Sequence, residues 1–495
     1  MLLLGYDIGS SSIKASLVDA ENGQVLGVVQ HPKTEMDISA PEEGWAEQDP
    51  QDWWDHLVQA TKQLFQSTRA KKEDIKGIGI SYQMHGLVLV DDQQNVLRPA
   101  IIWCDSRAVQ VGDKAFAEIG KEKCLRHLLN SPGNFTASKL KWVKENEPEV
   151  YDKINKFMLP GDYIAMKLTG KISTTIQGLS EAILWDFEEN KKADFLLEQL
   201  GIDPDLVPEV LPTFSDQGDI TAGAADTLGL EKGTPVTYRS GDQPNNAMSL
   251  NVLNPGEIAA TGGTSGVVFG IVDRPIFDVE SRVNSFAHVN HSASDPRIGV
   301  LLCINGAGIQ YRWMKQQLDQ DNLSYNDIEE MIADIPVNSE GLRIIPFGNG
   351  SERILGNRNI GSHIINLNFN THKKAHFYRA ALEGVAFSFV YGIEILREMG
   401  LNIDVIKVGN DNLFQSEVFS TSLCNLLGSR IEIMETTGAV GAARAAGVAT
   451  VAYKNLAEAM GEVKVVKTYE VTNTNGVYND AYQSWKSDLE KILVS

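Results

Sequence analysis

The chain has 495 residues, more than one hydrophobic core usually organises, so at least two domains are expected. Its 43% hydrophobic and 22% charged residues are typical of a folded globular protein and argue against disorder, a collagen-like repeat or a coiled coil. With 44 basic and 65 acidic side chains the net charge is −21, which disfavours nucleic acid as a partner and favours a small neutral substrate.

The sequence also gives an expectation for location. The cysteines are widely spaced and form no CxxC pair, so neither a disulfide framework nor a zinc site is indicated. The N-terminal apolar run breaks at Gly5 and Asp7, too early for a signal sequence. No stretch approaches the roughly 20 apolar residues that span a bilayer. We expect a cytoplasmic protein that does not enter a membrane.

An antiparallel meander is predicted at the start of the chain. Apolar runs at 2–6, 13–18 and 25–29 read as strands, separated by a Gly/Ser turn at 9–12 and by a polar turn at 21–23. The turn residues at both reversals place the start of the meander at residue 2.

Helices and strands then alternate. Asp49 and Pro50 supply an N-cap and a first-turn proline, and apolar residues from Trp54 onward recur at helical spacing. Strands are predicted at 75–81 and 88–90. The alternation predicts an α/β layered architecture.

A second copy of the opening pattern is predicted midway along the chain. Residues 257–260 and 267–272 are strand-like and flank a Gly/hydroxyl turn at 262–266. This weak repeat divides the chain into lobes of residues 1–253 and 254–495.

A long helix is predicted in the second lobe. Thr371 is its expected cap, Gly400 its expected end, and a strand at 405–408 follows.

If the chain binds phosphate groups, it does so without the two commonest phosphate-binding motifs. Neither GxxxxGK[ST] nor a GxGxxG after a strand occurs. The turns at 7–14 and 262–266 offer small residues, backbone N–H groups, hydroxyls and Lys14 instead. Either turn alone is more often a plain hairpin. Two of them at equivalent points of two lobes would face each other across a cleft that could hold a triphosphate.

Two acidic residues stand where chemistry is plausible. Asp7 interrupts an apolar strand, and a buried carboxylate is costly unless it is paired or near a cation such as Mg²⁺. The alternative is that it accepts hydrogen bonds from turn amides. Asp242 follows a strand at 235–238 and precedes a helix at 247–250, a switch point typical of α/β active sites. A helix cap is the alternative for Asp242.

Polar residues after two other strands are candidates for binding a polyhydroxylated ligand through hydrogen bonds. They lie at 83–86 and 103–107, where Trp103 offers an apolar wall. His85 could equally be a hydrogen-bonded core histidine. The HxxH of His288 and His291 has no acidic partner at ligand spacing, so metal binding there is disfavoured.

Eight segments together resemble the FGGY carbohydrate kinases, and they cover the whole chain in the family's order. These are LGYDIGSSSIKASLVD, GWAEQDPQDWW, YQMHG, IIWCDSR, SGDQPNNA, GEIAATGGTSG, YRAALEGVAFS and TGAVGAARAAG. The resemblance implies two ribonuclease-H-like, actin-type lobes with an interlobe cleft, sugar mainly on the first and ATP mainly on the second. Met-His in YQMHG is similar to the members that act on xylulose.

The resemblance also implies roles for individual residues. Asp242 would be the general base and Asp7 the Mg²⁺-linked acid. The implied sugar-side residues are Met84, His85, Trp103, Asp105, Asp242 and Gln243. The implied nucleotide-side residues are Ser10, Ser11, Ser12, Lys14, Gly263, Thr264, Ser265, Gly409, Asn410 and Asn412.

The sequence departs from the family pattern at several places, including Ser173-Thr174-Thr175, where an Asp is often found and no role is assigned. The usually glycine-rich adenosine turn reads Val408-Gly409-Asn410-Asp411-Asn412, which weakens the prediction of the adenine contacts. Cys104 and Gln243-Pro244 also replace more usual residues, and either change could alter the preferred sugar.

The activity implied is MgATP-dependent phosphorylation of a ketopentose, D-xylulose first, to D-xylulose 5-phosphate. In a loose phosphoryl-transfer transition state the hydroxyl keeps its proton late, so Asp242 need not have a raised pKa. The alternatives are a kinase for ribulose, rhamnulose, gluconate or glycerol, and a non-catalytic actin- or Hsp70-like ATP switch. Sugar and ATP are the expected partners, with a homodimer as an option.

Overall fold

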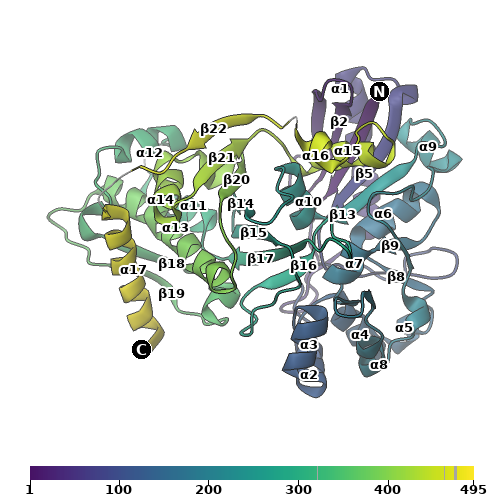
Figure 1. Cartoon of the computed structure of the whole chain (residues 1–495), viewed down its shortest axis with the longest axis horizontal. Coiled ribbons are helices and arrows are strands. Elements are labelled where there is room, and N and C mark those ends of the chain that lie inside the picture. The colour runs from purple at the N-terminus through teal and green to yellow at the C-terminus, as the bar shows by residue number, and fades with distance from the viewer. Residues whose placement is uncertain (320–321, 462, 473–475, 495) are drawn as a thin grey trace.

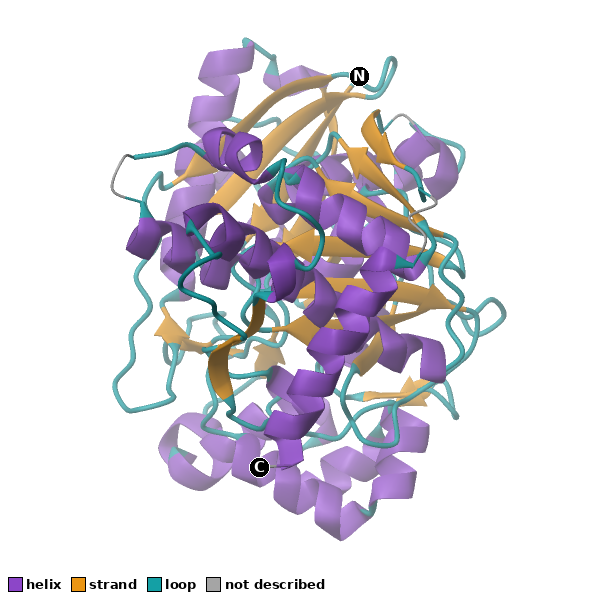
Figure 2. Ribbon diagram, turned by 90° about the vertical axis from the view of Figure 1, so that its left-hand side faces the viewer, coloured by secondary structure: helices purple, strands orange, loops and turns teal. Residues whose placement is uncertain are grey.

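A computed structural model describes residues 1–319, 322–461, 463–472 and 476–494 of the chain. Two β-sheets lie side by side, one in each of two lobes, and helices cover their faces (Figures 1 and 2). This arrangement confirms the predicted two-lobed α/β fold.

The first lobe is built on a five-stranded sheet in the order β13-β5-β1-β2-β3. β1 pairs antiparallel with β2 and parallel with β5, and β2 pairs antiparallel with β3, which confirms the predicted meander. The strands are β1 (Leu2–Ile8), β2 (Ile13–Asp19), β3 (Val25–His31), β5 (Ile75–Tyr82) and β13 (Val236–Gly241).

A seven-stranded sheet in the order β16-β17-β15-β14-β20-β21-β22 forms the second lobe. β14 pairs antiparallel with β15 and parallel with β20, the same relation that β1 has to β2 and β5. The predicted repeat is therefore present in the strand pairing. The strands are β14 (Glu257–Gly262), β15 (Gly266–Val272), β16 (Asn284–Ala287), β17 (Ile298–Ile304), β20 (Val405–Gly409), β21 (Arg430–Met434) and β22 (Val465–Tyr469).

Short two-stranded sheets and helices complete both lobes. The small sheets pair β4 (Glu47–Gln48) with β7 (Ala100–Ile101), β6 (Val88–Val90) with β8 (Lys156–Met158), β9 (Ser173–Thr175) with β12 (Glu209–Leu211), β10 (Trp185–Asp186) with β11 (Lys191–Lys192), and β18 (Arg343–Phe347) with β19 (Gly361–Ile365). The first-lobe helices are α1 (Pro50–Thr68), α2 (Val109–Ile119), α3 (Lys121–Leu128), α4 (Thr136–Asn146), α5 (Pro148–Tyr151), α6 (Pro160–Thr169), α7 (Ile176–Glu181), α8 (Asp194–Leu200), α9 (Ala222–Leu228) and α10 (Asp242–Ser249). The later helices are α11 (Gly308–Leu318), α12 (Tyr325–Ile332), α13 (Lys374–Glu398), α14 (Glu417–Leu427), α15 (Gly438–Ala449), α16 (Leu456–Gly461) and α17 (Val477–Val494).

Helix α1 forms as its sequence predicts. The Asp49 carboxylate accepts a hydrogen bond from the Gln51 N–H at 2.9 Å, and Pro50 occupies the first turn, where no amide donor is needed. Its buried face, which includes Trp53 and Leu57, packs against β2 and β3. The helix therefore closes the outer face of the strands that carry the first Gly/Ser turn.

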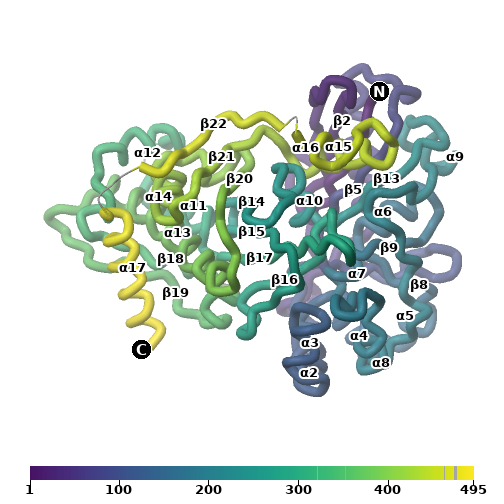
Figure 3. The backbone as a smooth tube through the Cα atoms, in the orientation of Figure 1, coloured from purple at the N-terminus to yellow at the C-terminus, as the bar shows by residue number. Residues whose placement is uncertain are grey.

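Helix α15 belongs to the second half of the sequence but packs on the first-lobe sheet (Figures 1 and 3). A Cβ added at Gly5 of β1 would overlap the Ala439 carbonyl, and one added at Gly79 of β5 would overlap the Ala442 carbonyl. Glycines in the strands and alanines in the helix thus allow a very close approach. The predicted division at residue 253 follows the order of the sheets but not this helix.

Two predicted helix boundaries are wrong. The cap of α13 is Lys373, whose N–H is 3.1 Å from His376 Nδ1, whereas Thr371 lies in a turn in which its N–H donates to the Asn368 carbonyl. Helix α10 begins at Asp242 and not at 247. Pro244 falls in its first turn, where the missing N–H costs nothing, so the proline does not delay the helix.

Candidate active site

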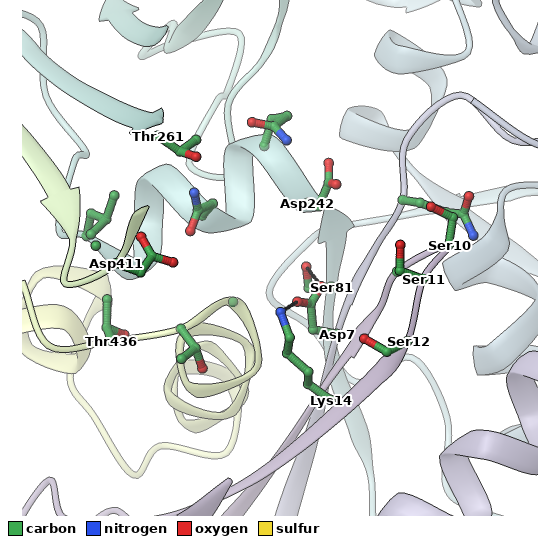
Figure 4. A pocket seen from close by; sticks show the side chains of 18 of the residues that line it. Asp7, Ser10, Ser11, Ser12, Lys14, Ser81, Asp242, Thr261, Asp411 and Thr436 are labelled. Carbon is green, nitrogen blue, oxygen red and sulfur yellow. Dashed lines mark hydrogen bonds and ion pairs between the residues drawn. The ribbon is translucent and has the colours of Figure 1, made fainter. Parts of the chain in front are cut away.

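A cavity of about 420 Å³ lies between the two lobes. The β1–β2 turn, α10, β14, the end of β20 and the start of α15 all contribute to its wall (Figure 4). Its lining residues are Asp7, Gly9, Ser10, Ser11, Ser12, Lys14, Ser81, Gln83, Trp103, Asp242, Gln243, Asn246, Leu250, Ala260, Thr261, Gly409, Asp411, Thr436, Thr437 and Gly438. The predicted interlobe cleft is therefore present, and it brings together residues from both halves of the chain.

Asp7 projects into this cavity near the end of β1 (Figure 4). Its carboxylate accepts a hydrogen bond from Ser81 Oγ at 3.1 Å, and Lys14 Nζ lies 3.9 Å away. Gly438, the first residue of α15, has no side chain to fill the space next to this carboxylate, since an added Cβ would lie 3.0 Å from Asp7 Oδ2. Asp7 is thus held at the cavity wall with its oxygens only partly used.

Asp242 is the first residue of α10 and faces the same cavity (Figure 4). Burial, reinforced by the negative charge of Asp7, raises the pKa of Asp242 from 3.8 to about 7, although hydrogen bonds from Gln243 oppose the shift. The sequence reasoning did not require a raised pKa. Asp242 and Asp7 thus face one space, and either a proton on Asp242 or a cation between the two would relieve their repulsion.

The serine turn and a tryptophan meet at one side of the cavity. Trp103 Nε1 donates a hydrogen bond to Ser10 Oγ at 3.2 Å, and the Trp103 side chain remains 54% exposed. Gln48 Nε2 donates to the Ser10 carbonyl at 2.7 Å, which anchors the turn to β4. The predicted phosphate turn and the predicted sugar wall are therefore in direct contact.

Two of the predicted sugar-side residues, Met84 and His85, do not line this cavity. Met84 is buried beneath Gly241, where an added Cβ would lie 2.6 Å from Met84 Cγ. His85 is half-buried, between the rings of Phe135 and Phe286 at centroid distances of 4.8 and 5.3 Å. Gln243 and Trp103 do line the cavity, as predicted.

Asp105, also predicted as a sugar-side residue, does not line the cavity either. It is fully buried, and its Oδ2 accepts hydrogen bonds from the Ala46 N–H at 2.6 Å and from Arg107 Nη2 at 2.7 Å. The Arg107 guanidinium is itself stacked 3.8 Å from the Trp45 ring centre. Asp105 therefore fixes the loop that carries Trp103.

The predicted nucleotide residues are divided between two cavities. Gly409 lines the first cavity with Ser10, Ser11, Ser12 and Lys14, whereas a second cavity of about 370 Å³ contains Gly263, Thr264 and Asn412. Ser265 and Asn410 line neither. Ser265 Oγ donates to Asn305 Oδ1 at 3.3 Å, and Asn410 Nδ2 donates to Glu435 Oε2 at 2.9 Å.

This second cavity contains residues that the sequence does not single out. Its wall includes Tyr311 and Arg312 of α11, Tyr325 and Glu329 of α12, and Leu413. The Tyr311 and Tyr325 rings lie 5.6 Å apart. No local motif marks these residues, because two helices supply them to a turn far away in sequence.

Several polar residues of the first cavity were also missed. Ser81 pairs with Asp7 in the parallel register of β1 and β5, so the strand assignment could have identified it. Thr437 caps α15 by accepting from the Val440 N–H, and it opens a segment, TGAVGAARAAG, that already carried the family resemblance. Asp411 stands in the turn that departs from the family pattern, and burial raises its pKa while Lys14 opposes the shift.

The side chains of the first cavity would suit a cation whose other ligands are water molecules and substrate phosphates. Among the described residues no three His, Cys, Asp or Glu side chains gather closely enough to hold a metal ion by themselves. Mg²⁺ in phosphoryl-transfer sites keeps several waters and uses one or two carboxylates plus substrate phosphates. Asp7, with its partly used carboxylate, fits that requirement.

A separate observation concerns membranes. Within the described residues, no helix combines the length and the apolar character needed to cross a bilayer.

Comparisons with known proteins give the family. Sequence models of the FGGY family of carbohydrate kinases match residues 2–249 (N-terminal domain) and 258–450 (C-terminal domain). The chain is 30% identical to a xylulose kinase of Bacillus subtilis, over 86% of this chain and 84% of that protein. It is also 30% identical to the L-xylulose/3-keto-L-gulonate kinase of Escherichia coli, over 93% and 91%.

A solved structure supports the fold. A crystal structure described as a xyloylose kinase from Brucella ovis superimposes with a TM-score of 0.89 at 24% identity and covers 99% of both chains. The likeness confirms the predicted two-domain, actin-type α/β architecture. The two family matches and the Bacillus subtilis relative show that this chain belongs to the FGGY family of carbohydrate kinases and is a sugar-phosphorylating phosphotransferase.

Proposed function

We propose that the enzyme transfers the γ-phosphoryl group of MgATP to O5 of D-xylulose, giving D-xylulose 5-phosphate and ADP. Curated relatives with 27–30% identity over most of the chain act on xylulose by name, which supports this substrate. The interlobe cavity supports the reaction class, because it combines a serine turn, a lysine and three carboxylates, those of Asp7, Asp242 and Asp411, in one space.

The position of Asp242 carries the proposal. Its carboxylate faces the cavity, and its pKa of about 7 lets it hold a proton near neutral pH. In the proposed step the sugar oxygen forms a bond to the γ-phosphorus while the bond to the β-phosphate oxygen breaks. The hydroxyl proton passes to Asp242, and ADP leaves with the bonding electrons.

The phosphates need local stabilisation, since the chain is acidic overall. The serine turn of residues 10–12 and Lys14 would donate to phosphate oxygens, and Lys14 is the cation among the residues that line this cavity. Mg²⁺, when bound, would offset charge on the transferring oxygens. Asp7 would hold it, directly or through water, together with the phosphates.

We assign the adenosine of ATP to the second cavity. Its volume of about 370 Å³ is adequate for a nucleoside, and Tyr311 and Tyr325 offer aromatic surface. The Gly263-Thr264 turn lies at its edge, where it would meet the first phosphates. This assignment includes Asn412 but leaves Ser265 and Asn410 as second-lobe residues without a nucleotide contact.

An ADP-release assay with MgATP across ketopentoses, polyols and sugar acids tests the function. D-Xylulose should give the highest kcat/KM. A clear preference for glycerol or gluconate, or for the sugars that the Escherichia coli relative is named for, would assign another substrate. ATP turnover indifferent to every sugar would instead favour the actin- or Hsp70-like switch.

Because ATP is the donor, we also place the enzyme in the cytoplasm.

A further inference from the structure

His85 has an unusual backbone conformation that its neighbours hold in place. Its φ is +62°, in the left-handed region that residues with a side chain rarely adopt. Both of its backbone polar groups are bound by the side chains of buried ionisable residues. The His85 N–H donates to Glu181 Oε2 at 3.1 Å, and the His85 carbonyl accepts from Lys139 Nζ at 2.9 Å. Such a conformation persists only where the surroundings determine it.

The His85 ring is fixed in one tautomer. Nδ1 lies 2.9 Å from the Glu181 backbone carbonyl, which can only accept, so Nδ1 carries the hydrogen. Burial lowers the pKa of His85 to about 3, with Lys139 acting in the same direction, so the ring is neutral at pH 7. Nε2 is therefore an unprotonated hydrogen-bond acceptor.

Lys139 ties the His85 loop to the Trp103 loop. It projects from α4, is fully buried, and donates from Nζ to the His85 carbonyl and to the Ile102 carbonyl, both at 2.9 Å. Ile102 directly precedes Trp103, which lines the first cavity. One ammonium group thus sets the spacing of the two loops that follow β5 and β7.

Glu181 ties the same loop to β13, the strand that ends at Gly241. It is 1% exposed, and a Cβ added at Gly241 would lie 3.2 Å from its Oε2 and 3.3 Å from its Oε1. Gly241 immediately precedes Asp242. The Glu181 carboxyl group therefore packs against the backbone that presents the proposed base while it binds the His85 N–H.

We propose that Lys139 and Glu181 form a clamp, here called the His85 clamp, that positions His85 so that Nε2 accepts a hydrogen bond from a hydroxyl of the sugar. Neither side chain touches the reacting atoms, so both are positioning residues. The inference rests on the proposed function and on the sugar role that the family resemblance implies for His85, and it extends the sugar site from the first cavity to the His85 loop. It adds that the sugar group bound by His85 is a hydroxyl that donates a hydrogen bond to Nε2.

Kinetics of matched variants test the clamp. Lys139→Met should raise the KM for sugar by about 10- to 100-fold, as expected for a misplaced binding group, and leave the KM for ATP near that of the parent. Lys141→Met on the same helix is the control, because Lys141 forms a partly exposed ion pair with Glu145 at 3.0 Å. Glu181→Leu should behave like Lys139→Met, whereas Glu181→Gln keeps an acceptor for the His85 N–H and should restore the sugar KM.

A spectroscopic measurement covers the case in which a clamp variant fails to fold. The parent protein, labelled with ¹⁵N-histidine, should show His85 as the Nδ1-protonated, neutral tautomer from about pH 5 to about pH 8. A His85→Gln spectrum assigns the signal. An Nε2-protonated His85, or one that titrates near its ordinary pKa, would overturn the proposal.

The outcomes separate the clamp from the proposed function. If no sugar in the panel is phosphorylated, the proposed function fails, whatever the histidine spectrum shows. If a sugar is phosphorylated but Lys139→Met folds and keeps the parental sugar KM, the clamp alone is wrong. Equal increases in the KM for sugar and for ATP would likewise show a general structural role and contradict it.

Discussion

A raised pKa makes an ionised carboxylate a better proton acceptor, although a loose phosphoryl-transfer transition state does not require one. Asp242 has such a pKa, about 7, because it is buried and because Asp7 disfavours its ionisation. A raised pKa on an acid means that the neutral form dominates below it. The residue can act as a base only above that pH.

The pH profile of the reaction follows directly. We predict that kcat/KM for the sugar rises with pH through an apparent pKa near 7, since kcat/KM reports the free enzyme and its Asp242 must be ionised. Initial rates at limiting sugar from about pH 5 to about pH 9 check this. A profile that is flat down to the ordinary pKa of aspartate would contradict it.

At the scale of single residues, the sequence predicted groups whose role is set locally. Asp7 and Asp242 both reach the cavity, because each stands at the end of a buried strand. Asp105 does not, because Arg107 two residues later folds back onto it and Ala46 supplies a further donor. That competition between partners depends on the fold, so the residue type alone could not reveal it.

At the scale of elements, the predictions were confirmed where the turn or capping residues lie within a few positions of the element that they define. The meander and α1 have turn residues and a cap within a few positions, and both are confirmed. The predicted start of α13 was wrong because Thr371 lies in a local turn, closed by its N–H and the Asn368 carbonyl, and the helix begins only after Lys373. Nothing in the local sequence explained the glycines of β1 and β5. They are needed because helix α15 packs directly against these strands.

The contact between α15 and the first sheet gives a stability prediction. Gly5→Ala and Gly79→Ala should each lower the free energy of unfolding by about 1–3 kcal/mol or more, because the new Cβ overlaps a helix carbonyl that cannot move alone. Gly223→Ala in α9 is the control: an added Cβ there meets nothing within 4 Å. It should be neutral or slightly stabilising. Urea unfolding of the three variants measures these free energies. Equal losses of stability in all three would disprove the close packing of α15 on the first sheet.

At the scale of the whole molecule, the sequence predicted two lobes and a cleft but not how segments cross between them. Helix α15 returns from the second half to the first sheet, and two helices of the second lobe build the cavity next to Gly263 and Thr264. Both features join segments that are distant in sequence. Periodicity and turn residues describe neighbours along the chain, so they could not predict such contacts.

The crossing of α15 predicts how a fragment behaves. A protein that ends at residue 253 lacks α15 and exposes β1 and β5 on the face that the helix covers. We expect this fragment to melt non-cooperatively or to aggregate, whereas the full chain unfolds with the first sheet protected. Circular dichroism melts of both proteins, with amide exchange of the β1 residues, are the measurement. A fragment with a cooperative transition and protected β1 amides would show that the first lobe is independent.

The most direct test of the account is the turnover of Asp242→Asn. The amide keeps the shape of the site and can still bind a hydroxyl, but it cannot take the proton, so kcat should fall by roughly 10²–10⁴ while the sugar affinity survives. ATP affinity should hold or improve slightly, because a carboxylate that repels the phosphates is gone. A folded Asp242→Asn protein that turns over within a few-fold of the parent would exclude Asp242 as the base and contradict the proposed mechanism.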